Sequence, residues 1–290
     1  MTPDFLAKSL GDRARIGADG AARLLDEGRQ WDLAPVLQSG GSLIFPHATI
    51  DVCGRQIAAV VHACLDCGAP SVVALGVLHA RTPELAQARA RVAGGGDCTQ
   101  EPMHGIQGPD FPGREDWKSE FSLSHFQFLW DEELKRRGDS GPTLSACYPF
   151  LAGGRPELLP GIERLRALCR DSVIVATMDA YHHGIGYGDM PDAARFPENG
   201  GLEMARNEIA AGFNLLRSAD YRRYDQHCVR TKSDGRDVGQ ALRLLKGPLD
   251  FELLDLVADD MARVYGKPAP TWVACALIAL HPGSRRNIER

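Results

Sequence analysis

The sequence lacks several features that would place it outside the ordinary globular proteins. It has no long hydrophobic run: the longest extends over nine residues, from Trp272 to Leu280, whereas a helix that spans a bilayer needs about 20. It has no excess of basic residues, because 33 lysines and arginines face 38 aspartates and glutamates, for a net charge of −5. We therefore expect no membrane association and no binding to nucleic acid.

Secretion signals are absent as well. The first residues contain no basic region followed by an apolar run and a small-residue cleavage site, so we expect no signal peptide. The eight cysteines are scattered through 290 residues, and a chain of this length buries roughly 75% of its unfolded surface without needing disulfides. These observations predict reduced cysteines and a cytoplasmic protein.

Common catalytic and binding motifs are missing or incomplete. No Gly-x-Ser-x-Gly occurs, which disfavours a serine hydrolase. Cys64 and Cys67 form one CxxC with no second pair, at the end of a predicted helix, where no helix N-terminus would stabilise a thiolate. We interpret this pair as packing. The glycines at 184, 186 and 188 follow a predicted strand but lack the rest of a phosphate-binding loop.

Short apolar runs alternate with amphipathic segments along the chain. This alternation predicts an α/β fold with a mostly parallel sheet and helices on both faces. No linker divides the chain, so we expect a single domain over 1–290, with 1–40 as an N-terminal extension packed on it. The expected strands are Ser42–Phe45, Ser71–Leu78, Leu144–Leu151, Ser172–Thr177 and Thr271–Leu280, and the expected helices are Arg55–Cys67, Lys118–Arg137, Pro160–Arg170, Leu202–Ser218 and Val238–Lys246.

Histidines follow three of the expected strands. His47 comes after the first strand, His79 after the second, and Asp179, His182 and His183 after the fourth. Ligands of open α/β sheets bind beyond the carboxyl ends of parallel strands, and imidazole both binds metals and transfers protons near neutral pH. The pattern predicts a metal site or a His/Asp acid–base site. The alternative for each histidine alone is a hydrogen bond to a backbone carbonyl.

Five segments carry a pattern beyond the single histidines. They are Pro-His-Ala-Thr-Ile-Asp-Val-Cys-Gly at 46–54, Ala-Leu-Gly-Val-Leu-His at 74–79, Glu-Phe-Ser-Leu-Ser at 120–124, Thr-Met-Asp-Ala-Tyr-His at 177–182 and the apolar run at 272–280. In this order they resemble motifs of the Memo family, whose prokaryotic members are called AmmeMemoRadiSam system protein B. That family is related in fold to the LigB-type, class III extradiol ring-cleaving dioxygenases. The resemblance covers most of the chain, from about 43 to 280, and implies a three-layer αβα domain.

The resemblance implies a metal held by two histidines and a cysteine, and the histidines correspond to His47 and His79. The family cysteine precedes a glycine that opens a helix; matching the glycines places Asp234 there, before Gly235. The alternatives are that Asp234 caps the following helix, or that Cys228 is the third ligand. Two histidines and a carboxylate are typical of non-heme Fe(II) oxygenases, so we expect Fe(II), with Mn, Cu and Zn as alternatives.

The same resemblance implies acid–base groups beside the metal. A histidine of the ring-cleaving relatives deprotonates the bound phenol, and His182 takes that position, with Asp179 orienting its imidazole. Phe121 and Ser124 replace a histidine and a glutamate of the family motif. His125, which we place one helical turn after Phe121, is the expected substitute. The sequence assigns no role to His183.

The expected function is therefore that of an Fe(II)-dependent oxygenase that uses O2 on a small, catechol-like substrate. Two alternatives remain open at this point: a non-catalytic metal- or ligand-binding scaffold of the Memo type, and a hydrolase with a metal-bound water. We expect the loops at 94–118 and 186–200 to shape the pocket. The sequence carries no pattern that sets an oligomeric state.

Overall fold

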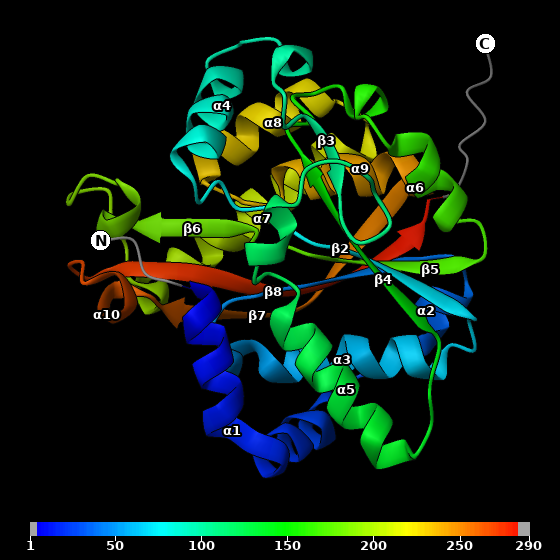
Figure 1. Cartoon of the computed structure of the whole chain (residues 1–290). Coiled ribbons are helices and arrows are strands. Elements are labelled where there is room, and N and C mark those ends of the chain that lie inside the picture. Colours follow the sequence, from blue (N-terminus) through cyan, green and yellow to red (C-terminus); the bar gives the residue numbers. More distant parts are fainter. Residues whose placement is uncertain (1–4, 284–290) are drawn as a thin grey trace.

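The computed structural model describes residues 5–283, and within them the protein is an α/β domain built on one eight-stranded sheet (Figure 1). The strand order is β3-β4-β2-β5-β1-β8-β6, and β7 pairs with β8. The strands are β1 (Ser42–Phe45), β2 (Ser71–Leu75), β3 (Gly105–Gln107), β4 (Thr143–Phe150), β5 (Ser172–Thr177), β6 (Tyr181–Gly184), β7 (Leu249–Asp260) and β8 (Thr271–Pro282).

The centre of the sheet is parallel, as the sequence predicts. Strands β4, β2, β5 and β1 run in one direction, and Val72 to Leu75 of β2 are at most 1% exposed because both faces are covered. The last expected strand is present as β8, but it pairs antiparallel with β1, and β3, β6 and β7 are antiparallel as well. The sheet is thus mixed around a parallel core.

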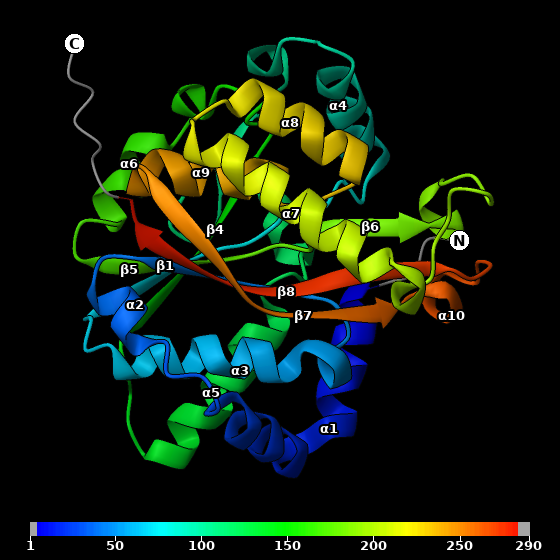
Figure 2. The same ribbon diagram turned by 180° about the vertical axis from the view of Figure 1, so that it is seen from behind.

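Helices cover both faces, which confirms the three-layer architecture. Helices α1, α3 and α5 lie on one face, and α6, α7, α8 and α9 lie on the other (Figures 1 and 2). The helices are α1 (Phe5–Gly28), α2 (Ala34–Gln38), α3 (Ile50–Asp66), α4 (Pro83–Ala93), α5 (Ser124–Arg137), α6 (Ile162–Leu168), α7 (Gly201–Arg217), α8 (Tyr221–Thr231), α9 (Arg236–Lys246) and α10 (Ala262–Tyr265).

One expected helix begins later than predicted. The segment 118–137 was expected to be continuous, but a short 3-10 helix covers Asp116–Ser119 and α5 begins only at Ser124. Glu120 interrupts the helix because its carboxylate accepts the backbone N–H groups of Phe121 and Ser122. The predicted end is correct: Gly138 adopts a left-handed conformation there, with φ 64°.

Three strands were not predicted: β3, β6 and β7. Strand β3 lies within the expected loop 94–118 and pairs antiparallel with β4. His182 and His183 belong to strand β6 and not to an irregular loop, because they pair with Val273 and Trp272 of β8. Strand β7 covers the outer edge of β8, and its sequence Leu-Asp-Phe-Glu-Leu-Leu-Asp mixes polar and apolar residues without strict alternation. A register shift between Leu253 and Asp255 explains why the period-2 pattern fails.

Helices α1 and α2, within the first 40 residues, pack against the rest of the domain. Helix α1 contacts α3 and α5, and it crosses α3 closely at Gly28, where an added Cβ would lie 2.7 Å from the Cβ of Ala58. Among the helices of residues 5–283, none is long and apolar enough to cross a membrane.

Candidate metal centre

His47 lies at the carboxyl end of β1, and a neighbouring hydroxyl sets its tautomer. Its Nδ1 lies 3.0 Å from Oγ1 of Thr177 on β5. That hydroxyl donates its single proton to the carbonyl of Phe45, at 2.9 Å, so it accepts a hydrogen bond from Nδ1–H. The other ring nitrogen, Nε2, is left with a lone pair directed into the protein interior.

His79 follows β2 and is oriented in the same way by a buried carboxylate. Its Nδ1 donates to Oε1 of Glu120 at 2.9 Å, and its backbone N–H donates to Oε2 at 2.6 Å. Burial opposes ionisation of Glu120, but the charge of His79 and the backbone hydrogen bonds outweigh it and lower the pKa of this carboxyl. The ring of Phe121 stacks on His79 with centroids 4.6 Å apart, so the imidazole is held on two sides.

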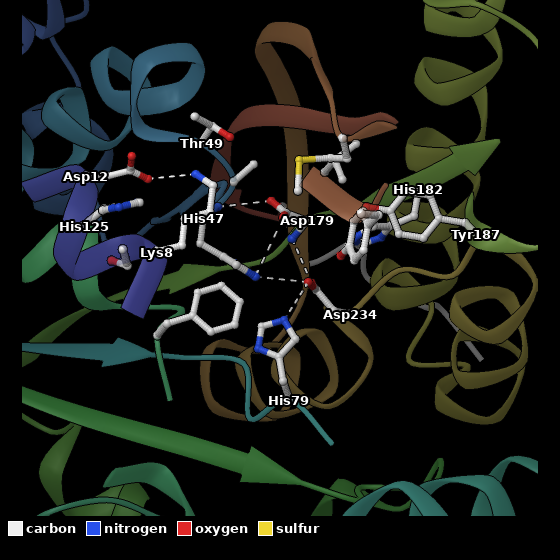
Figure 3. A pocket seen from close by; sticks show the side chains of 16 residues that line it. Lys8, Asp12, His47, Thr49, His79, His125, Asp179, His182, Tyr187 and Asp234 are labelled. Carbon is white, nitrogen blue, oxygen red and sulfur yellow. Dashed lines mark hydrogen bonds and ion pairs between the residues drawn. The ribbon is translucent and has the colours of Figure 1, made fainter. Parts of the chain in front are cut away.

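Asp234 lies between α8 and α9 and points toward both histidines (Figure 3). Its Oδ1 accepts the backbone N–H of Asp179 at 2.8 Å. Its Oδ2 lies 3.1 Å from Nε2 of His47 and 3.6 Å from Nε2 of His79. The alternative of a helix cap is not what the structure shows, since Gly235 is the N-cap of α9 and no side chain caps that helix.

The three side chains therefore present three acceptor atoms to one point. The ligand atoms of His47, His79 and Asp234 all lie within 4.8 Å of one another, and both His47 Nε2 and Asp234 Oδ2 are buried without a hydrogen-bond partner. Lone pairs that converge in this way are satisfied when a cation, either a proton or a metal ion, lies between them. The residues present fit a divalent metal ion, and the identity of the metal is a separate question.

The electrostatics show how strongly the site favours positive charge. Burial favours the neutral form of His79, but Glu120 and Asp234 outweigh it and raise its pKa to about 10. The pKa of His47 is raised in the same sense by Asp179 and Asp234 against burial. Burial raises the pKa of Asp234, yet the histidines lower it well below its ordinary value. Protons occupy the cluster when no metal does, and metal binding would release them.

Asp179 and His182 stand beside this centre and share Asp234 with it. Their ligand atoms and that of Asp234 also lie within 4.8 Å of one another. Asp179 does not orient the imidazole through a hydrogen bond, because its Oδ1 accepts the backbone N–H of His47 at 3.1 Å while His182 Nδ1 is buried without a partner. Burial lowers the pKa of His182, although Asp234 and Asp179 oppose this, so its neutral form is favoured.

His125 also lines the cavity, but the predicted helical spacing from Phe121 is wrong. Phe121 precedes α5, so the two residues are not one helical turn apart. His125 is 5% exposed and its Nε2 has no hydrogen-bond partner. Burial lowers the pKa of His125 to about 4; nearby Asp12 opposes this, and Arg13 and Lys8 add to it.

His183 and Cys228 lie outside the centre. His183 Nδ1 lies 2.9 Å from Asp189, and its Nε2 accepts the backbone N–H of Arg195 at 2.9 Å, so it fastens the loop after β6. Cys228 is 1% exposed, and neither group of convergent ligands within 5–283 contains a cysteine. All eight cysteines of the chain are free thiols, and Cys64 is buried in the core as expected for packing.

The cavity around the centre includes residues that the sequence did not single out. Its volume is about 60 Å³, and its lining includes Lys8, Ser9 and Asp12 from α1 together with Tyr187, Met261 and Tyr265. Lys8 and Asp12 lie on one side of His47, and Tyr187 lies on the other (Figure 3). The N-terminal extension therefore contributes to the site. Of the two expected pocket loops, 186–200 supplies Tyr187, and 94–118 supplies none of the lining residues. In the sequence, Lys8 and Asp12 are distinguished only by a spacing of four residues, which suits an ion pair along a helix.

No protein-family model matches this sequence, and no curated protein matches it either.

Proposed function

We propose that this protein is a non-heme Fe(II)-dependent oxygenase that acts on a small, catechol-like substrate with O2. The observation that carries the proposal is the convergence of His47 Nε2, His79 Nε2 and Asp234 Oδ2, within 4.8 Å of one another, with both imidazoles fixed as Nδ1–H tautomers. Two histidines and one carboxylate are the ligand set of Fe(II) oxygenases, which leaves metal positions open for substrate and oxygen. The Memo and LigB-type resemblance of the sequence agrees with this proposal.

Iron held by these three residues would supply the site with a redox-active Lewis acid. The carboxylate favours Fe(II) or Mn(II) over Cu(I), because the third ligand is a hard oxygen and not a soft thiolate. Zinc fits the same donors. The metal is therefore part of what the experiment must identify.

The acid–base role falls to His182. One of its ring nitrogens lies within 4.8 Å of carboxylate oxygens of Asp179 and Asp234, and burial lowers its pKa and favours the neutral form, so the imidazole is able to accept the proton of a substrate hydroxyl. Tyr187 packs edge-on against the ring of His182, at 4.8 Å between centroids, and holds it in place. The carboxylate of Asp179 would stabilise the imidazolium that forms.

Aromatic and apolar side chains form part of the cavity wall. Phe121 stacks on His79 and lies edge-on to His47, at 5.9 Å between centroids, and Met261 and Val273 line the same cavity. An aromatic substrate would find apolar contacts there and the polar groups of the centre at one side.

One observation favours a second candidate, a non-catalytic metal-binding scaffold. The cavity of about 60 Å³ is well below the roughly 300 Å³ at which ligand pockets usually begin. A protein that only stores or senses a metal would need no more space than this. An oxygenase with this cavity would be restricted to small substrates or would open to admit them.

The deciding experiment separates metal binding from turnover. Wild type, His47→Ala and His281→Ala are reconstituted anaerobically with Fe(II) and assayed for bound iron. His281 is the control because it lies near the C-terminal end of β8 and pairs with Glu252 at the surface. We expect iron in wild type and His281→Ala but not in His47→Ala, and equal iron in all three would reject the metal site. Oxygen uptake with catechols then distinguishes an oxygenase from a scaffold, which would bind iron without consuming oxygen.

A further inference from the structure

A second cavity adjoins the metal centre from the other side. It lies between α4, the end of α8 and the start of α9, has a volume of about 340 Å³, and shares His79 and Asp234 with the first cavity. It is thus the larger of the two. The two ligand residues form part of the wall between them.

Three cations from three different elements line this second cavity, which we call the basic groove: Arg89 of α4, Lys232 at the end of α8 and Arg236 at the start of α9. Of its lining residues, Asp234 alone is acidic, and its charge is compensated by the two histidines it faces. The lining therefore carries three cationic side chains and one carboxylate.

Each cation is anchored from behind by a carboxylate outside the lining. Arg89 Nη2 donates to Asp237 at 2.9 Å, Arg236 forms two hydrogen bonds with Asp225 at 2.8 and 3.1 Å, and Lys232 pairs with Asp189. Such pairing does not saturate the donors, since a guanidinium has five N–H groups. It fixes the cations in position, which lowers the entropy lost when a ligand binds.

Arg89 shows this most clearly. Its guanidinium lies 4.5 Å from the centroid of the Phe150 ring, and Nη2 also donates to the carbonyl of Leu78. Within residues 5–283, the structure gives Nε and Nη1 of Arg89 no hydrogen-bond partner. Because Nη2 belongs to both forks of the guanidinium, Nε–H and Nη1–H remain as two separate donors, each able to give one hydrogen bond to an oxyanion oxygen.

We propose that the basic groove is a binding site for a small oxyanion, the phosphate or carboxylate group of a metabolite-sized molecule. A remaining N–H of Arg89 and the ammonium of Lys232 would contact the oxyanion, and the apolar lining residues Val77, Leu78 and Val229 would reduce the competition from water. The proposal does not depend on which reaction, if any, the metal centre performs.

The test measures binding of inorganic phosphate and of malonate by isothermal titration calorimetry. Chelator-treated protein is used, so that neither probe can bind through a metal ion. The variants are Arg89→Gln and Lys232→Met, and the control is Arg166→Gln, whose side chain pairs with Glu163 on the exposed face of α6. We expect each groove variant to weaken binding by about tenfold and the control to leave it unchanged.

The outcomes are distinct. Tighter phosphate binding assigns the groove to phosphate esters, and tighter malonate binding assigns it to carboxylates. If wild type binds neither probe, or if both groove variants bind as tightly as the control, the proposal is overturned. Arg89 also supports Asp237, so thermal melting checks each fold, and Lys232→Met decides the matter if Arg89→Gln does not fold.

Discussion

Thr177 Oγ1 lies 3.0 Å from His47 Nδ1 and donates its own proton to the carbonyl of Phe45 at 2.9 Å. The hydroxyl of Thr177 on β5 thus sets the tautomer of the His47 imidazole, which follows the neighbouring strand β1. It does so because its own proton is donated to the carbonyl of Phe45, the last residue of β1. This relationship fixes which nitrogen of His47 faces His79 and Asp234, and it makes the centre sensitive to residues that do not touch the metal.

Replacement of Thr177 by valine is therefore expected to weaken metal binding by about 10- to 100-fold. Valine keeps the shape of threonine but accepts no hydrogen bond, so Nδ1–H of His47 would be left buried without a partner, or the tautomer would change. Metal affinity, measured by competition with a chromophoric chelator, checks this. Thr177→Ser should bind close to wild type, and Thr143→Val, at the exposed start of β4, is the control. Unchanged affinity in Thr177→Val would show that the hydroxyl does not set the tautomer.

Glu120→Gln tests the support of His79. The carboxylate accepts four hydrogen bonds, from Nδ1 and the backbone N–H of His79 and from the backbone N–H groups of Phe121 and Ser122. An amide has one acceptor oxygen and would direct an NH2 group at some of these donors. We expect the free energy of unfolding to fall by about 1–3 kcal/mol and metal affinity to fall at least about tenfold.

Chemical denaturation and chelator competition measure the two effects in Glu120→Gln. The matched control is Glu115→Gln, since Glu115 forms an exposed ion pair with Lys118 and contributes little to stability. If both variants behaved alike, Glu120 would not be a positioning residue.

The central ligands could be predicted from the sequence because of a simple geometric rule. His47 and His79 follow strands that proved to be parallel members of one sheet, and the carboxyl ends of such strands meet at one edge. Asp234 required the family resemblance, because it comes from a turn between two helices that no strand pattern places. The apolar runs at 42–45 and 172–177 predicted the exact bounds of β1 and β5.

The remaining parts of the site depend on long-range packing that sequence patterns do not encode. Lys8 and Asp12 reach the cavity only because α1 packs across α3 and α5. Glu120 is in the sequence motif, but its role follows from hydrogen bonds formed after the chain returns to His79. Strand β6 forms because β8 is present to pair with it, not because Tyr-His-His-Gly favours a strand.

The lowered pKa of His125 predicts a specific loss of stability in mild acid. The group has a pKa of about 4 in the folded protein against an ordinary value of 6.5, so the unfolded chain binds the proton first. Its contribution to stability is complete above about pH 6.5 and is lost as the pH falls toward about 4. Between about pH 7.5 and about pH 5, wild type should lose roughly 2 kcal/mol more unfolding free energy than His125→Gln, which has no titrating ring.

Urea denaturation of both proteins over this pH range, with chelator present, checks the His125 prediction. The difference between the two proteins isolates His125 from the other groups that titrate in the cluster. If the unfolding free energies of the two proteins changed in parallel with pH, the pKa of His125 would be the same in the folded and unfolded states, and the prediction would be wrong.

Asp234→Cys is expected to change which metal the centre selects. The carboxylate presents a hard oxygen to the two imidazole nitrogens at 3.1 and 3.6 Å, and a thiolate would present a soft ligand at the same position. Soft ligands favour Cu(I) and Zn(II), whereas carboxylates suit Fe(II) and Mn(II). Metal content after anaerobic dialysis against equal concentrations of Fe(II), Mn(II) and Zn(II), with Cu(I) offered separately, should therefore shift from iron and manganese toward zinc and copper. Asp192→Cys, which adds a thiol at an exposed loop position, should retain the wild-type selection, and Asp234→Ser should lose most of the metal. If Asp234→Cys selected the same metals as wild type, the third ligand would have to come from another residue. The nearest carboxylate to His47 Nε2 besides Asp234 is that of Asp179, whose Oδ2 lies at 3.8 Å.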